Sequence, residues 1–220
     1  FKGKYFNCGN SKHSNFSIFS FHPIKAITTF EGGMVTTNSK KFYEKLKLYR
    51  SHGIKRSKFN WKYDVAETGF NFRLSDVACS VGISQLNKLK KFIKKRNQIA
   101  KYYFRTLKEI PEINFTFDKF PNYNSWHLFI ILINFEHLKI SKLNLLKKLR
   151  LNGIVAQINY IPTSSFSNFK KDIKIKNINS ISFFKKALSI PIYYELTIKE
   201  QKYISQTIQN LIISNIKKRC

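Results

Sequence analysis

One stretch of thirty-odd residues, from Ser75 to about Leu107, keeps the apolar spacing of a single continuous helix. Ser75 precedes Asp76 and is a suitable N-terminal cap. Such a length is unusual inside one small domain, so the pattern predicts a helix that bends or passes from one domain to another. The apolar face of this helix is formed by Val77, Val81, Ile83, Leu86, Leu89, Phe92, Ile93 and Ile99.

Shorter elements are predicted on both sides of this helix. Before it, the pattern predicts strands at 16–21 and 34–37, a helix at 39–50 capped by Ser39, and a loop at 52–68. After it, strands are predicted at 113–117, 127–133 and 154–160, helices at 142–151, 180–188 and 198–216, a polar loop at 163–178 and a short extended piece at 190–192. The alternation of strands and helices in the second half indicates a small α/β domain.

The formal net charge of +28 is, taken alone, typical of proteins that bind nucleic acid. However, 33 lysines stand against 7 arginines, and they are spread along the whole chain. Proteins that read bases favour arginine, because its planar guanidinium pairs with guanine in two places. We therefore expect a solvated surface that reflects an AT-rich coding sequence, and no specific nucleic-acid partner.

The three cysteines, Cys8, Cys79 and Cys220, are odd in number and widely spaced. This pattern indicates neither a disulfide framework nor a metal site, and it favours a reducing compartment, the cytoplasm. No apolar run approaches the roughly 18–20 residues of a membrane span. The first residues also lack the pattern of a signal peptide. We expect no membrane partner.

The densest group of candidate functional residues lies around Lys25. This lysine follows a predicted strand, with Ser20 and His22 just before it and Glu31-Gly32-Gly33 after it. A lysine partly removed from water can keep a neutral amine that attacks a carbonyl carbon, and a serine hydroxyl can bind a phosphate oxygen. Among so many lysines, a plain surface charge is the alternative interpretation of Lys25. The paired glycines predict a tight turn or a close backbone approach.

The segment Ser-Phe-His-Pro-Ile-Lys-Ala-Ile-Thr-Thr-Phe-Glu-Gly-Gly, residues 20–33, resembles the lysine motif of the DegT/DnrJ/EryC1/StrS sugar aminotransferases, which use pyridoxal 5'-phosphate. Residues 69–76 with 82–86, and residues 152–162, resemble two further signatures of that family, and residues 125–129 and 188–191 follow in the same order. The resemblance implies an α/β, pyridoxal-phosphate-dependent transferase fold of type I. Residues 1–85 would be the C-terminal part of the cofactor-binding large domain, and residues 86–220 the connecting helix and a small C-terminal domain.

The resemblance also implies roles for individual residues. Lys25 would be the catalytic lysine, bound covalently to the cofactor and then moving the proton of the reaction. Ser20 would hold the cofactor phosphate. Asn71 would reach the phosphate in a partner subunit, because family members are typically dimers with shared active sites. In related sugar dehydratases a histidine replaces the lysine, so Lys25 favours amino transfer over dehydration.

Three residues are candidates for binding the substrate, and each has a structural alternative. Tyr160 would face the sugar pocket or pack internally, although the family commonly has His-Tyr where this chain has Asn159-Tyr160. Arg73 would pair with substrate phosphates or hold a carboxylate such as Asp76. His22 would contact the substrate or be a buried, hydrogen-bonded side chain.

The implied activity is transfer of an amino group, from glutamate as the expected donor, to a nucleotide-linked 4-keto-6-deoxy sugar for surface-glycan synthesis. Family members carry a further stretch upstream, with the aspartate that pairs with the pyridine nitrogen and the ring that stacks on the cofactor. We therefore expect the active site to be incomplete in this chain. A non-catalytic basic binding protein and an inactive truncated remnant remain the alternatives.

Overall fold

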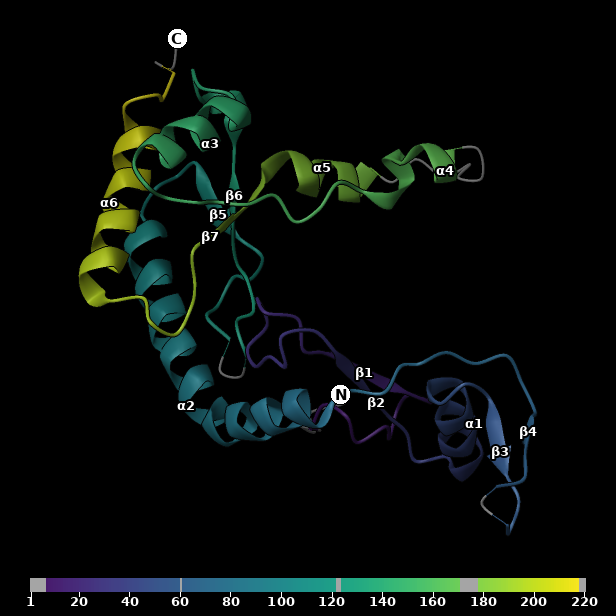
Figure 1. The fold of residues 1–220 in the computed structure, drawn as a ribbon. Helices are drawn as coiled ribbons and strands as arrows, with labels where there is room; N and C mark the ends of the chain where they lie inside the picture. The colour runs from purple at the N-terminus through teal and green to yellow at the C-terminus, as the bar shows by residue number, and fades with distance from the viewer. Residues whose placement is uncertain (1–6, 60, 122–123, 171–177, 218–220) are drawn as a thin grey trace. The chain divides into compact units, whose positions relative to one another are not determined.

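The computed structural model describes residues 7–59, 61–121, 124–170 and 178–217. The chain forms two compact units, Phe1–Leu89 and Lys90–Cys220 (Figure 1). Helix α2, Asp76–Leu107, runs without interruption from the first unit into the second. The predicted long helix is therefore confirmed, and so is its cap, because the Ser75 Oγ accepts the backbone N–H of Ala78 at 3.2 Å. The assignment of residues 1–85 and 86–220 to a large and a small domain stays a prediction.

The first unit begins with two strands and a helix, as predicted. Strands β1 (Ser17–Ser20) and β2 (Gly33–Thr36) pair antiparallel, with Ser20 opposite Gly33. Helix α1 (Lys40–Arg50) starts at Ser39, whose side chain accepts the N–H of Phe42 at 3.4 Å. This capping bond is the one that the sequence predicts.

The prediction of a loop over residues 52–68 is wrong. This range contains a short hairpin of β3 (Ile54–Arg56) and β4 (Tyr63–Val65), with Lys55 opposite Asp64. Each strand has only three residues, Ile-Lys-Arg and Tyr-Asp-Val, which is too short a run for an apolar alternation to be distinguished from a loop. Its strands are held by backbone pairing across the hairpin, which the periodicity of a single strand does not report.

The second unit is built on a three-stranded antiparallel sheet, in the order β5-β6-β7. These strands are β5 (Ile113–Phe115), β6 (Phe129–Ile133) and β7 (Ala187–Ile190). The sheet packs with α3 (Lys142–Leu151), α6 (Ile198–Ile213) and the second half of α2 around one apolar core. Its fully buried members include Ile99, Tyr103, Leu107, Phe129, Ile131, Ile133, Leu145, Leu149, Leu188, Leu196, Ile208 and Ile212.

Three polar contacts align α2 with its neighbours in the second unit. The side chain of Gln209 on α6 donates to the carbonyl of Thr106 at 2.7 Å, and the hydroxyls of Thr106 and Ser205 lie 3.3 Å apart. The hydroxyl of Tyr103 donates to the carbonyl of Pro191 at 3.0 Å. Burial raises the pKa of Tyr103, which keeps this hydroxyl protonated as a donor.

Two predicted elements of the second unit are corrected by the structure. The range 154–160 is not a strand, because only Gln157 pairs, through an isolated bridge to Ser189. The helix predicted at 180–188 is α5, Ile178–Lys186, and the chain then enters β7, earlier than the predicted extended piece at 190–192. All four residues of β7 are buried against β6, so sheet pairing overrides the helical spacing there.

The remaining connections are short. A 3-10 turn, η1 (Phe135–His137), follows β6. The predicted polar loop at 163–178 contains η2 (Thr163–Ser165) and α4 (Ser167–Lys170), while 171–177 lie outside the described residues. Among the helices that the structure describes, none has both the length and the apolarity required to cross a membrane.

Candidate active site around Lys25

Lys25 lies on the connection between β1 and β2 in the first unit. The base of this connection is closed by two backbone hydrogen bonds, from the N–H of Phe21 to the carbonyl of Gly32 at 2.9 Å and from the N–H of Thr29 to the carbonyl of Phe21 at 3.0 Å. The hydroxyl of Thr28 adds a third bond to the carbonyl of Phe21, at 2.9 Å. The lysine is thus carried by a closed loop, residues 22–31, at the end of the sheet.

A tight turn over residues 22–25 sets the position of the lysine. The N–H of Lys25 donates to the carbonyl of His22 at 3.0 Å. Pro23 occupies the second position of this turn, where its fixed φ suits the turn geometry. Pro23 and Ile24 are exposed, whereas Lys25 is half-buried. The turn therefore brings the lysine back toward the protein.

The imidazole of His22 braces the same turn. Its Nδ1 accepts the N–H of Ile24 at 3.4 Å, and its Nε2 lies 3.7 Å from Oε1 of Glu31. An imidazole that accepts at Nδ1 carries its proton on Nε2, which here faces the carboxylate. The side chain of His22 is 47% exposed, so it is not the buried histidine of the structural alternative. The sequence interpretation assigned no role to Glu31.

Ser20 lies at the end of β1, close to this turn. Its Oγ accepts the backbone N–H of His22 at a long 3.5 Å, and the residue is exposed. An acceptor in that bond keeps its own proton for another partner, such as a phosphate oxygen. The structure thus brings together Ser20, His22 and Lys25, three of the six predicted site residues.

Neighbouring atoms lie so close to Gly32 and Gly33 that both positions require glycine, as the sequence predicts. Gly32 has a φ of +147°, and a Cβ there would lie 2.7 Å from both Leu74 Cδ1 and Thr29 Oγ1. A Cβ on Gly33 would lie 2.8 Å from the carbonyl oxygen of Phe19. Leu74, to which the sequence interpretation gave no role, therefore packs against the lysine loop.

Asn71 is positioned by the end of α1. Flanking backbone bonds run from Phe70 N to Tyr49 O at 2.8 Å and from Phe72 N to Arg50 O at 3.0 Å. The side chain of Asn71 is exposed, so its amide is open to a ligand or a partner.

Arg73 lies two residues further along, in the same exposed segment. It makes no ion pair with any carboxylate among the described residues, Asp76 included. Within the described residues, its guanidinium has no carboxylate partner, and its role stays a prediction.

Tyr160 belongs to the other unit, where it is 71% exposed. The peptide bond before it is cis, and the amide oxygen Oδ1 of Asn159 is buried without a hydrogen-bond partner among the described atoms. This exposure of Tyr160 does not agree with the alternative in which its side chain packs internally.

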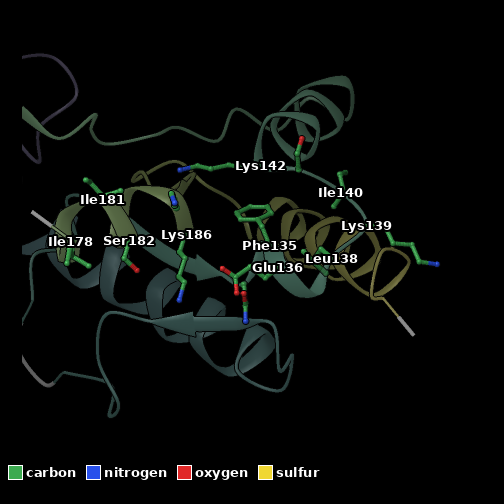
Figure 2. A pocket seen from close by; sticks show the side chains of 13 residues that line it. Phe135, Glu136, Leu138, Lys139, Ile140, Lys142, Ile178, Ile181, Ser182 and Lys186 are labelled. Atoms are coloured by element: carbon green, nitrogen blue, oxygen red, sulfur yellow. The ribbon is translucent and has the colours of Figure 1, made fainter. Parts of the chain in front are cut away.

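A cavity of about 730 Å³ lies in the second unit, and none of the predicted site residues lines it. Figure 2 shows its two walls, one from η1 and residues 138–142 and the other from α5. Lys142 crosses between them, because its Nζ donates to the carbonyl of Phe184 and lies 4.8 Å from the centre of the Phe184 ring. Burial lowers the pKa of Lys142. These contacts attach α5 to the start of α3.

Comparisons with known proteins show which family the chain resembles. Residues 5–209 match the DegT/DnrJ/EryC1/StrS aminotransferase family. A UDP-4-amino-4,6-dideoxy-N-acetyl-beta-L-altrosamine transaminase from Campylobacter jejuni is 41% identical over 208 residues, which are 94% of this chain and 54% of the relative. A protein of the same name from Helicobacter pylori is 33% identical, over 87% of this chain and 51% of the relative.

A solved structure shows the same likeness. Helicobacter pylori PseC, an aminotransferase involved in the biosynthesis of pseudoaminic acid, matches with a TM-score of 0.83 and 31% identity. The match covers 91% of this chain and 54% of PseC. This chain therefore spans about half the length of the relatives that it matches.

The predicted α/β fold of a pyridoxal-phosphate-dependent transferase is confirmed by these matches, and so is the resemblance drawn from the motifs. The matched range includes the lysine loop and most of the core of the second unit. The chain belongs to the DegT/DnrJ/EryC1/StrS aminotransferase family.

Proposed function

We propose that this chain forms the lysine-bearing part of a pyridoxal-phosphate-dependent sugar aminotransferase. The observation that carries the proposal is the closed loop that holds Lys25 half-buried beside the exposed hydroxyl of Ser20. The relatives at 41% and 33% identity are both named as transaminases of an amino sugar linked to UDP. The substrate that this likeness supports is a nucleotide-linked 4-keto-6-deoxy sugar, in a pathway of the pseudaminic acid type.

The donor groups of the loop suit pyridoxal 5'-phosphate. A primary amine, on Lys25, is the group that combines with its aldehyde, and a hydroxyl, on Ser20, is a donor to its phosphate. Asn71 offers an exposed amide for a phosphate bound in a second subunit. When bound, the cofactor supplies an electron-withdrawing ring that stabilises negative charge on the substrate carbon.

The chain's own contribution to the reaction lies in the amine of Lys25. When this amine is free and not bound to the cofactor, its Nζ takes the proton from the reacting carbon and returns it at the next step. The turn at His22-Pro23 limits the positions open to the amine, since the backbone N–H of Lys25 is tied to the carbonyl of His22 at 3.0 Å. His22, Arg73 and Tyr160 are exposed and are proposed to contact the sugar nucleotide.

Assembly and location are part of the same proposal. The active enzyme is a homodimer with shared active sites, which would give the exposed amide of Asn71 a function. The amino donor is glutamate. The protein works in the cytoplasm, where the exposed thiols of Cys8 and Cys79 stay reduced.

Labelling of Lys25 tests the proposal. The purified chain is mixed with pyridoxal 5'-phosphate, reduced with borohydride and mapped by peptide mass. The label is expected on the peptide that contains Lys25 and is expected to disappear in Lys25→Ala. Lys41→Ala is the matched control, because Lys41 is an exposed lysine of the same unit. Equal labelling of many lysines, unchanged in Lys25→Ala, would refute the proposal.

A further inference from the structure

The cavity of the second unit is lined by an excess of positive charge. Four lysines line it, Lys139, Lys142, Lys185 and Lys186, against a single carboxylate, on Glu136. None of the four forms an ion pair with a carboxylate within the part of the chain that the structure describes. The N-terminus of α3 also lies in the lining, and the first turn of this helix carries no acidic residue. Because charge of one sign in a hollow concentrates ions of the opposite sign, the cavity favours anions.

The walls between these charges are largely apolar. Phe135, Leu138 and Ile140 lie on one wall, and Ile178 and Ile181 on α5 form the other (Figure 2). The volume of about 730 Å³ is within the range of sites that bind small molecules. The lining therefore suits an organic anion that has an apolar body.

Lys142 differs from the other three lysines in its surroundings. It is half-buried, whereas Lys139, Lys185 and Lys186 are exposed. Its side chain extends from α3 toward α5, where its Nζ donates to the carbonyl of Phe184 and lies over the ring of that residue (Figure 2). Burial lowers the pKa of Lys142, so a larger share of this amine is neutral than on an exposed lysine. The neutral form is the one that attacks a carbonyl carbon.

We infer that Lys142 is a carbonyl-reactive amine and that the cavity beside it binds small anionic aldehydes. The exposed lysines of the lining attract the negative group of the aldehyde, and the apolar walls cover its body. The lone pair of Nζ forms a bond to the aldehyde carbon, and the carbonyl oxygen leaves as water with the two protons of the amine. The product is an imine, and the step consumes no oxidant or reductant. The site lies within the second unit, so it holds or fails independently of the function proposed for Lys25.

Competition between lysines of the original chain provides the test. The chain is mixed with a limiting amount of 4-formylbenzoate, the imines are reduced with borohydride, and the modified lysines are identified by peptide mass. Modification of Lys142 is expected to exceed that of Lys147, an exposed lysine of the same helix, by about tenfold. Benzaldehyde is expected to lose most of this preference, because it lacks the negative group that the cavity attracts.

Paired substitutions separate the charge of the cavity from the charge of the whole surface. In Lys185→Gln with Lys186→Gln, modification of Lys142 by 4-formylbenzoate is expected to fall about threefold, because the cavity loses two of its cations. Modification by benzaldehyde is expected to stay the same. The matched control is Lys199→Gln with Lys202→Gln, two exposed lysines of α6 that do not line the cavity, and it is expected to have no effect.

Three results would overturn the inference. They are modification of Lys142 at no more than the level of Lys147, the same preference with benzaldehyde as with 4-formylbenzoate, and an equal loss in the control pair. Lys25→Ala is expected to leave the modification of Lys142 unchanged, because the two lysines lie in different units and on different peptides. The outcome is therefore read separately from that of the proposed aminotransferase function.

Discussion

The methyl group of Thr29 lies where a side chain on Gly82 would begin, since a Cβ on Gly82 would come within 2.8 Å of Thr29 Cγ2. Thr29 belongs to the loop of Lys25, and Gly82 belongs to α2. The hydroxyl of Thr29 also donates to the carbonyl of Glu31 at 2.9 Å. One buried threonine thus connects the lysine loop to the long helix, and only a glycine at position 82 leaves room for it.

Gly82→Ala is expected to lower the stability of the lysine loop despite improving helix propensity. The helical gain from alanine is about 1 kcal/mol, whereas overpacking at a buried contact costs about 1–3 kcal/mol. We expect faster amide hydrogen exchange over residues 21–32 in Gly82→Ala.

The double variant Gly82→Ala with Thr29→Ser tests the cause of that effect. Serine keeps the hydroxyl that binds Glu31 and removes only the methyl group that clashes. Exchange over residues 21–32 is expected to return to the level of Thr29→Ser alone. If the double variant exchanges as fast as Gly82→Ala, the contact between the two residues is not the cause.

Ser20→Ala is expected to weaken binding of pyridoxal 5'-phosphate by about tenfold to a hundredfold, because a hydrogen bond to a charged group contributes about 1.5–3 kcal/mol. Labelling of Lys25 as a function of cofactor concentration measures the effect. Ser17→Ala is the control, since Ser17 lies on the same strand but points to the opposite face. Equal effects of the two variants would show that Ser20 does not contact the phosphate.

Arg96 is expected to be a structural anchor of the second unit. It is 6% exposed, and its Nη1 donates to the carbonyls of Trp126 and Ile192, both at 2.9 Å, and of His127 at 3.4 Å. Burial lowers the pKa of Arg96. Arg96→Met leaves these carbonyls without their donor and is expected to lower the free energy of unfolding by about 3 kcal/mol in urea titrations. Arg105→Met, at an exposed arginine of the same helix, is expected to change it by less than about 0.5 kcal/mol.

The start of α6 predicts a dependence of stability on pH. The carboxylate of Glu200 accepts the hydroxyl and the backbone N–H of Thr197, both at 2.7 Å, and these bonds lower the pKa of Glu200. A lowered pKa in the folded state stabilises the fold above the ordinary glutamate pKa of about 4.3, and this contribution is lost as the pH falls through the lower value. The loss in free energy of unfolding between pH 7 and acid is therefore expected to be smaller in Glu200→Gln than in the original chain. Urea unfolding at both pH values measures this difference.

Thr197→Ala tests the other residue of the same capping box. It removes the side-chain acceptor for the N–H of Glu200, at 3.2 Å, and is expected to cost about 1 kcal/mol of unfolding free energy at pH 7. Glu195→Gln serves as the control, because Glu195 is exposed and lies outside the capping box. An acid dependence that is the same in Glu200→Gln as in the original chain would contradict this explanation.

Local sequence patterns were sufficient to predict those features that depend only on residues close together in the chain. The caps at Ser39 and Ser75 and the end of α3 at Leu151 were all predicted, because each depends on side chains or backbone freedom within a few residues. The group of Ser20, His22 and Lys25 was predicted for the same reason, since the three residues lie within one loop. The contact of Glu31 with His22 was not, because it depends on how the loop closes.

The sequence by itself determined the long helix α2, the lysine loop and the membership of the family, since periodicity and motif spacing are properties of the linear chain. Only the tertiary structure decided that residues 54–56 pair with residues 63–65, that residues 187–190 join the sheet instead of a helix, and that Thr29 fits against Gly82. It also revealed that the second unit buries a core while the first exposes Ile18 and Ile83. These features depend on contacts with other segments of the chain, and strand pairing and burial follow from such contacts more than from local preference.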